Sequence, residues 1–155
     1  MIAITEETDR LLDSVGWHIL RELQANARIP FSELGRRVGL SSPAVTERVR
    51  RMEDAGIISG YHVTLNLAMV GLPMQAIMRI RAYAGRSPQI AARVCDMPEV
   101  LECHKVTGSD CYVMKVAVES VQHLEAIIDS LAHYGDVTTS LVLSTPVERR
   151  IIEPD

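Results

Sequence analysis

Arginines and short polar side chains are concentrated in residues 41–56, whose sequence is SSPAVTERVRRMEDAG. Guanidinium groups bind phosphate oxygens and the acceptor edge of guanine, and short polar side chains can bind other base edges. This stretch therefore has the chemistry to contact double-stranded DNA. We expect four residues to meet base edges: Ser42, Thr46, Glu47 and Arg50.

Four further arginines have the chemistry to hold phosphates, and they are Arg36, Arg37, Arg48 and Arg51. Between residues 28 and 51 the chain carries six arginines and two glutamates, although its net charge is −4. Such a local basic face can act on DNA even in an acidic protein, because electrostatic fields extend over about one Debye length. With Ser41 added at the start of the stretch, the candidate DNA-contacting residues are Arg36, Arg37, Ser41, Ser42, Thr46, Glu47, Arg48, Arg50 and Arg51.

Residues 41–56 have the pattern of one helix with defined ends. A serine can cap the N-terminus, Pro43 suits the first turn, and Gly56 suits a left-handed residue at the C-terminus. Apolar residues at i, i+4 and i+7 form one narrow buried stripe, namely Val45, Val49 and Met52. The polar side chains that flank or oppose this stripe are left accessible from outside.

The preceding residues complete a helix-turn-helix. Residues 31–38 predict a short helix, and residues 39–41 predict a tight turn that contains a glycine. Helical domains that never contact DNA can also contain this order of elements, so the pattern alone leaves both interpretations open.

Composition limits the alternatives. A chain of 155 residues forms one ordinary domain or two small ones. With one Trp, one Phe and four Tyr, base stacking on an aromatic platform is not the expected binding mode. Three cysteines without a CxxC pair predict free thiols in a reducing cytosol, and the spacing of Cys103, His104 and Cys111 matches no zinc site. Without a signal-peptide pattern or a membrane-spanning run, the sequence predicts a soluble cytoplasmic protein that needs no metal or cofactor.

The predicted fold class is α+β, with two domains. Residues 1–58 should form a winged-type helix-turn-helix domain of three helices, in which residues 1–10 are frayed and Asp13 caps a first helix running to about Ala25. Gly16, in the first turn of that helix, is a poor helix former. Residues 59–73 predict a strand-like linker, and residues 74–155 a second domain.

The predicted elements of the second domain follow the order strand, helix, strand, strand, helix, strand, which is the ferredoxin-like βαββαβ order. The strands are expected at residues 74–82, 100–107, 112–118 and 137–144, with helices beginning at about Ser87 and Ser120. Two helices cover only one face of such a sheet. Apolar residues of the other face, including Ile77, Val113 or residues beside Cys111, would then need a partner, which predicts a homodimer.

The chain resembles the Lrp/AsnC (feast/famine) family of transcription regulators over essentially its full length. Each matching piece is short, and the order and spacing of the pieces together are specific. The matching residues are Leu12-Asp13, Ile19-Leu20, Leu23, Arg28, Glu33-Leu34-Gly35, Val38-Gly39-Leu40-Ser41, Val45, Arg48-Val49, Met52-Glu53, Gly56-Ile57-Ile58, Gly60-Tyr61, Gly71-Leu72, Cys103-His104, Gly108 and Tyr112.

This resemblance implies a DNA-binding N-terminal domain and a C-terminal domain that dimerises and assembles dimers into tetramers or octamers. It also implies that an amino acid or another small effector binds between dimers. The effector-binding positions it suggests are Gly108, Ser109, Asp110, Cys111, Tyr112, Thr138, Thr139 and Ser140.

The sequence departs from the family at two positions. The family commonly has an acidic residue where this chain has Gly16, which predicts a slightly less stable helix. The family's loop often has Gly-x-x-Asp-Tyr, whereas this chain has a cysteine, Cys111, in place of that aspartate. Asp110 lies one residue earlier, and neighbouring residues on a strand point to opposite faces, so Asp110 cannot simply substitute.

Two alternatives remain from the sequence. Siroheme decarboxylases resemble the same two-domain architecture, and His104, Arg79 and Arg81 could then surround a tetrapyrrole. The other alternative is an architectural DNA-binding protein without effector control, which differs from a regulator in its specificity ratio.

Overall fold

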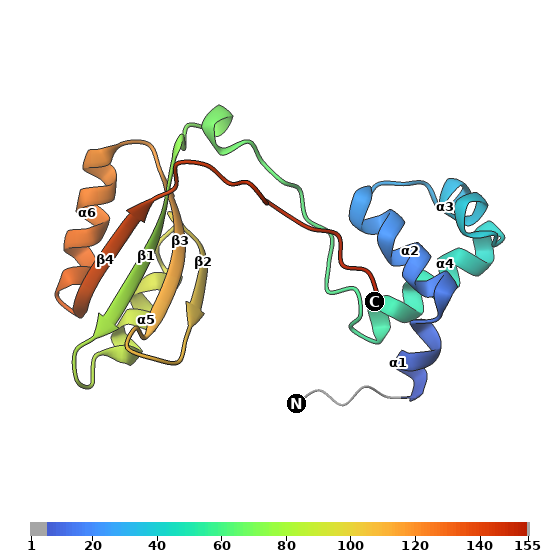
Figure 1. Ribbon diagram of the computed structural model, residues 1–155, viewed down its shortest axis with the longest axis horizontal. Coiled ribbons are helices and arrows are strands. Elements are labelled where there is room, and N and C mark those ends of the chain that lie inside the picture. The colour runs from blue at the N-terminus through green and yellow to red at the C-terminus, as the bar shows by residue number, and fades with distance from the viewer. Residues whose placement is uncertain (1–5, 155) are drawn as a thin grey trace. The chain divides into compact units, whose positions relative to one another are not determined.

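The computed structural model describes residues 6–154, which form two compact units (Figure 1). Unit 1 contains the described residues up to Val63 together with those from Val147 onward, and unit 2 is Thr64–Pro146. The sequence placed the end of the chain in the second domain. In the structure the last residues group with unit 1.

Unit 1 is helical. Its elements are α1 (Glu6–Leu11), α2 (Ser14–Ala25), α3 (Phe31–Val38) and α4 (Ser42–Asp54). The three expected helices are present, and α1 is additional. The prediction that residues 1–10 are frayed was wrong from Glu6 onward, and its first five residues lie outside the described part. Leu11 at the end of α1 is buried in the core of unit 1, and this contact holds the short helix in place.

The predicted caps set the helix ends in unit 1. The Asp13 carboxylate accepts a hydrogen bond of 2.8 Å from the Gly16 N–H at the start of α2. Gly39 ends α3 with φ of 73°, a left-handed conformation that favours glycine. The Ser41 hydroxyl oxygen accepts from the Ala44 N–H at 3.4 Å, so Ser41 is the cap of α4.

Gly16 is required by the fold, contrary to the expectation from helix propensity. A Cβ at this position would lie 1.8 Å from the Leu11 carbonyl oxygen and 3.0 Å from the Met52 methyl group. Only glycine lets the end of α1 approach the first turn of α2 this closely. An acidic side chain could not occupy this position without moving the backbone.

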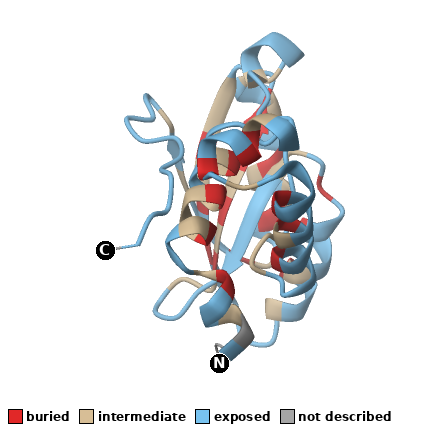
Figure 2. Ribbon diagram, turned by 90° about the vertical axis from the view of Figure 1, so that its right-hand side faces the viewer, coloured by how far each residue is buried: buried red, intermediate tan, exposed pale blue. Residues whose placement is uncertain are grey.

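The expected stripe of α4 forms the centre of the unit 1 core, with Val45, Val49 and Met52 at most 1% exposed. It packs with residues from α1, α2 and α3 and from the loop after α2, namely Leu11, Ile19, Leu23, Ile29, Leu34 and Val38. Figure 2 shows that buried residues lie where the helices face one another, whereas outward-facing residues are exposed. The buried stripe therefore fixes α4 to the core of unit 1 and leaves the outer surface of the helix exposed.

The segment between the units differs from the prediction. Residues 57–66 contain no strand, and a short 3-10 helix, η1 (Leu67–Val70), precedes the sheet. The strand-like linker is thus an extended coil followed by one turn of helix. Among residues 6–73 the structure has no strand, so the expected wing of the helix-turn-helix domain is not formed there.

Unit 2 has the predicted ferredoxin-like order. Its elements are β1 (Met74–Ala82), α5 (Ser87–Cys95), β2 (Val100–Lys105), β3 (Tyr112–Val118), α6 (Val121–Ala132) and β4 (Gly135–Leu141). The four strands form one antiparallel sheet in the order β2-β3-β1-β4. Compared with the prediction, β2 ends two residues earlier, and β4 is shifted toward the N-terminus.

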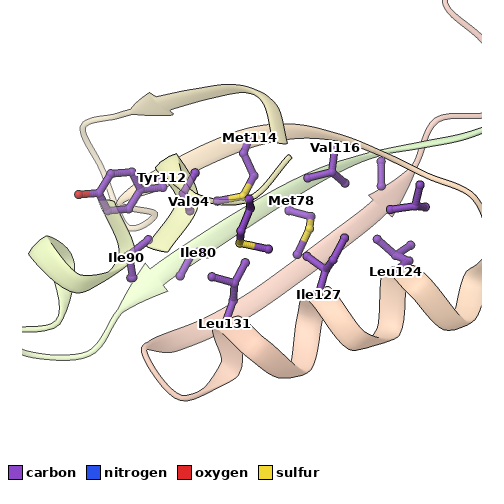
Figure 3. Packing of buried hydrophobic residues seen from close by; sticks show 13 residues of the cluster. Met78, Ile80, Ile90, Val94, Tyr112, Met114, Val116, Leu124, Ile127 and Leu131 are labelled. Carbon is purple, nitrogen blue, oxygen red and sulfur yellow. The ribbon is translucent and has the colours of Figure 1, made fainter. Parts of the chain in front are cut away.

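Alternate residues of each central strand point toward the helices. Met78 pairs with Met114, and Ile80 pairs with Tyr112. Figure 3 shows these side chains packed against residues of the two helices, including Ile90 and Leu131. This layer is the core of unit 2.

The other face of the sheet has no helix of unit 2 over it, since both helices of that unit pack on the first face. Ile77 and Val113 lie on this face and are half-buried, as expected. Cys111 differs, because it packs against the core cluster on the helical side. Among the described helices, none is long and apolar enough to cross a membrane.

Candidate nucleic-acid interface and effector site

The outer surface of α4 presents the four candidate base-contacting residues. Ser42, Thr46, Glu47 and Arg50 are all exposed. The Thr46 hydroxyl donates a hydrogen bond of 2.8 Å to the Ser42 carbonyl oxygen. With that bond kept, Thr46 can offer only an acceptor lone pair and its methyl group to a base, which suits contact with a donor or a thymine methyl.

Arg50 presents a highly exposed guanidinium on this surface. Its side chain is 72% exposed, and its Nε lies 3.8 Å from a carboxylate oxygen of Asp54. An exposed pair at this distance contributes little to stability. Arg50 can therefore exchange Asp54 for a base edge or a phosphate at little cost.

Arg48 has a different environment from the one expected of a phosphate ligand. Its side chain is only 23% exposed and forms an ion pair with Asp13. Its guanidinium also donates to the carbonyl oxygen of Arg10 at 3.3 Å. Arg48 thus joins α4 to the end of α1 and to the cap of α2, and this geometry makes it a positioning residue for α4.

The charge of Asp13 is stabilised from two sides. The Gly16 N–H and then the Arg48 guanidinium hold the pKa of Asp13 below its ordinary value, against the opposing effect of burial. Because the folded-state pKa is the lower one, this contribution to stability is present above the unfolded pKa of about 4. It is lost as the pH falls through the folded-state value.

We expect Arg48→Met to lower the free energy of unfolding by roughly 1–2 kcal/mol, because the apolar stem stays and two charge-assisted contacts are lost. The salt dependence of DNA binding should not change. Chemical denaturation followed by the fluorescence of Trp17, the single tryptophan, measures the first quantity. A lower salt slope with unchanged stability would instead assign Arg48 to a phosphate.

Arg36 and Arg37 lie on α3 and are paired with carboxylates. Arg36 donates two hydrogen bonds to Glu33, at 2.9 and 2.7 Å. Arg37 donates to Glu33 at 2.8 Å and to Glu22 at 2.7 Å. The bonds from the two arginines lower the pKa of Glu33 to about 2. Both arginines are exposed enough to turn toward phosphate, but Glu22 and Glu33 offset much of their charge.

Arg51 faces a shallow hollow of about 380 Å³ beside the helix-turn-helix. The hollow lies between α1, the turn before α4 and the first half of α4. It is lined by Arg10, Leu11, Leu40, Ala44, Glu47, Arg48 and Arg51. Two exposed arginines at its edge, Arg10 and Arg51, give this surface a positive rim.

The carboxylates that pair with these arginines are not among the residues predicted from the sequence. Glu33 is three and four residues before Arg36 and Arg37, a spacing that places them on one helix face and could have been recognised. Asp13 and Glu22 are far from their arginine partners in the sequence. No local signal connects them, because helix packing alone brings them together.

Tyr112 is not placed to bind an effector on the uncovered face of the sheet. Its side chain is 5% exposed and belongs to the helical side of the core. Its hydroxyl donates to the Ser87 carbonyl oxygen at 3.1 Å and lies 3.0 Å from the Ser87 hydroxyl. Tyr112 therefore fixes the start of α5 on the sheet, and its side chain has little surface left for an effector.

The loop before Tyr112 is a tight connection between β2 and β3. The Val106 N–H donates to the Cys111 carbonyl oxygen at 3.0 Å, and the Cys111 N–H donates to the Ile80 carbonyl oxygen at 2.8 Å. Gly108 has φ of 112°, which favours glycine. Gly108, Ser109 and Asp110 project at the end of the sheet, whereas Cys111 is half-buried against the core.

The candidates on β4 divide between the two faces. Thr138 pairs with Arg79, and Ser140 pairs with Ile77, so both lie on the uncovered face and are exposed. Thr139 pairs with Met78 and points toward the helices. The Thr139 hydroxyl is buried without a hydrogen-bond partner among the described atoms. The loop and the start of β4 lie at the same end of the sheet, about 10 Å apart across β1.

The residues proposed for a tetrapyrrole site also lie on the uncovered face. His104 and Arg79 both pair with Val113, so they flank it in one row across the sheet. The His104 side chain is 67% exposed. Within the described residues, no group of three histidine, cysteine, aspartate or glutamate side chains is arranged to hold a metal.

Two family models match the chain. A model described as the AsnC-type helix-turn-helix domain matches residues 12–53, and one described as the Lrp/AsnC ligand binding domain matches residues 75–152. The first match covers α2, α3 and all but the last residue of α4, and the second covers the sheet from the second residue of β1 onward.

Relatives match the chain nearly end to end. It is 39% identical over 134 residues to an uncharacterised helix-turn-helix-type transcriptional regulator of Bacillus subtilis, YezC, covering 86% of this chain and 95% of YezC. The structure of B. subtilis LrpC superposes with a TM-score of 0.84 at 30% identity, covering 89% and 99% of the two chains.

A second solved structure is that of the Neisseria meningitidis regulator NMB0573 in complex with L-Met. It superposes with a TM-score of 0.85 at 30% identity and covers 91% of this chain and 96% of the other. Both halves of the chain, in the same order and over nearly the full length, thus have the architecture of these regulators. The chain belongs to the Lrp/AsnC family of helix-turn-helix transcriptional regulators.

Proposed function

We propose that this protein regulates transcription by binding specific DNA sequences with the outer surface of α4. The observation that carries the proposal is the structure of α4. Its stripe of Val45, Val49 and Met52 is buried, whereas Ser42, Thr46 and Arg50 are exposed at its surface. A rigid helix that presents hydroxyl and guanidinium groups is suited to the major groove.

The protein would act as a homodimer or a larger assembly of dimers, such as a tetramer or octamer. The uncovered face of the sheet, which includes Ile77 and Val113, supplies an association surface within unit 2. Two copies of α4 would then contact two half-sites separated by one or more helical turns of DNA.

An amino acid is the proposed class of effector. The N. meningitidis relative is recorded in complex with L-Met, and the matched model is a ligand binding domain. In this chain the accessible candidates are Gly108, Ser109 and Asp110 in the loop, with Thr138 and Ser140 on β4. The Cys111 side chain packs against the core, and its N–H and carbonyl oxygen are hydrogen-bonded to Ile80 and Val106, so Cys111 has little left to offer an effector.

The alternatives have less support. The relatives are named as transcriptional regulators, and none of the three described above is named as an enzyme. An architectural DNA-binding protein would use the same α4 surface but would show little preference among sequences. Because its target is DNA, we place the protein in the cytoplasm.

Arg51 is proposed to hold a phosphate, and Arg51→Ala should weaken binding to all DNA sequences to a similar extent. The slope of log affinity against log salt should become less steep by about 0.9. Titrations at several salt concentrations, on the operator and on an unrelated duplex, measure this change. A loss confined to the operator would show that Arg51 contacts a base.

A gel-shift titration with the DNA upstream of the protein's own gene tests the proposed function. It is run against unrelated competitor DNA, with and without a pool of amino acids. We expect a complex that survives the competitor and whose affinity changes with one amino acid. A complex that the competitor abolishes would support the architectural alternative.

A further inference from the structure

The C-terminal segment from Val147 onward belongs to unit 1. There the amide side chain of Gln24 on α2 binds both backbone groups of Ile152. Its Nε2 donates to the Ile152 carbonyl oxygen at 2.9 Å, and its Oε1 accepts from the Ile152 N–H at 2.9 Å. This is the pattern by which one strand residue pairs with another, made here by a side chain.

The binding surface extends along the outer face of α2. Ser14, Trp17, Arg21 and Gln24 recur at helical spacing on the side opposite the buried Ile19 and Leu23. A surface hollow of about 410 Å³ lies along this side and is lined by Ser14, Trp17, His18, Arg21, Glu153 and Pro154. Tail and helix thus form the hollow together.

The ion pair between Arg21 and Glu153, next to the Gln24 contact, adds little to the stability of the docked segment. Arg21 Nε lies 3.9 Å from a carboxylate oxygen of Glu153, and both side chains are about half exposed. Such a pair contributes little to stability. The Ile152 side chain is 69% exposed, so apolar burial does not hold the segment either. The two hydrogen bonds to Gln24 are the directional contacts that fix it.

We propose that the outer face of α2 is a docking site for the chain's own C-terminal segment, and that the docked segment is a strap with Gln24 as its clamp. With the clamp closed, the strap is a second connection between the DNA-binding helices and the sheet domain, completed by the two hydrogen bonds to Gln24.

The docked strap limits how far the two units can move apart, because its chain is short. With the clamp closed, residues 142–152 join the end of β4 to α2 and can span at most about 40 Å. With the clamp open, only residues 55–73 connect the units, and these can span about 65 Å. Closing the clamp therefore restricts the space that the DNA-binding unit can explore, which changes its effective concentration at a second half-site.

Gln24→Glu is the sharpest substitution because it keeps the size of the side chain and one acceptor for the Ile152 N–H. It replaces the donor with a carboxylate oxygen that faces the Ile152 carbonyl oxygen, so the contact becomes repulsive. Gln122→Glu is a matched control, because it makes the same change at an exposed position of α6 in unit 2.

Hydrogen exchange of the Ile152 amide in the full-length protein tests the strap. In the wild type and in the control variant Gln122→Glu, which keeps Gln24, we expect this amide to exchange at least about tenfold more slowly than in an unstructured peptide. In Gln24→Glu the protection should fall to nearly none. Trypsin should then cut after Arg149 and Arg150 several-fold faster.

A second variant separates loss of the clamp from unfolding of α2. Ile152→Pro removes the N–H from the tail and leaves the helix sequence intact. It should give the same faster cleavage after Arg149 and Arg150, while the Val49 amide in α4 stays protected. That amide reports in every variant that unit 1 is folded.

Three results would overturn the strap. One is an Ile152 amide that exchanges in the wild type as in an unstructured peptide. Another is protection that Gln24→Glu leaves unchanged. The third is protection that increases with protein concentration, because the tail of a second copy would then occupy the site. None of these readouts involves DNA, so the strap and the proposed function of α4 can fail independently.

Discussion

Replacing Arg50 with alanine is expected to weaken operator binding by about 5- to 150-fold, which corresponds to roughly 1–3 kcal/mol. Arg50 lies on the exposed surface of α4, and its distant pair with Asp54 competes weakly for the guanidinium. A guanidinium that donates to a guanine edge distinguishes that base pair from the others. The loss should therefore be much larger on the operator than on unrelated DNA.

Fluorescence anisotropy titrations at one salt concentration measure this effect. Arg86→Ala is the matched control, because Arg86 is an exposed arginine of unit 2, outside the proposed interface. It should leave both affinities unchanged. Equal losses on operator and unrelated DNA would make Arg50 a phosphate contact, and an unchanged operator affinity would remove it from the interface.

Replacing Gly16 with alanine should destabilise unit 1 by more than about 3 kcal/mol, at or beyond the upper end of typical overpacking costs. The added Cβ would lie 1.8 Å from the Leu11 carbonyl oxygen, which belongs to the backbone and cannot rotate away. The end of α1 would have to move, and with it the Arg10 carbonyl that Arg48 contacts. Operator affinity should fall as well.

Gly39→Ala provides the comparison within the same unit. Gly39 has a positive φ, but an added Cβ there meets nothing within 4 Å. Its expected cost is only the roughly 1–2 kcal/mol of a left-handed alanine. Denaturation followed by Trp17 fluorescence ranks the two variants. A Gly16→Ala protein as stable as Gly39→Ala would show that α1 does not pack on α2 as described.

Much of the DNA-binding unit could be predicted from local signals. Ser41, Pro43 and Gly56 mark the ends of α4, and the spacing of Val45 and Met52 identifies its buried stripe. These residues act within one helix, where sequence separation translates directly into direction. The α4 surface therefore follows from the sequence alone.

Features that depend on packing between distant segments could not be predicted. Helix propensity predicted that Gly16 would weaken α2. In the structure a glycine is necessary there, because the Leu11 carbonyl oxygen lies where a Cβ would be. Arg48 lies at the edge of the α4 stripe, and only the folded unit brings Asp13 to it. The docking of Ile152 on Gln24 likewise has no periodic signal in the sequence.

The surroundings of the candidate effector residues were the least predictable part of the structure. The alternation of Tyr112 with Met114 and Val116 indicates a core-facing side chain, and this signal was available in the sequence. The family resemblance instead placed Tyr112 in the site together with the loop. The pairing of Thr138 with Arg79 required the sheet order, because β1 separates β3 from β4.

The central claim is that α4 distinguishes DNA sequences. The most direct measurement is the ratio of dissociation constants for the DNA upstream of the protein's own gene and for a shuffled duplex of the same length and composition, at one physiological salt concentration. We predict that the upstream DNA binds at least about 10³-fold more tightly. A ratio near one, with a steep salt dependence on both duplexes, would contradict the claim and leave a protein that binds the DNA backbone alone.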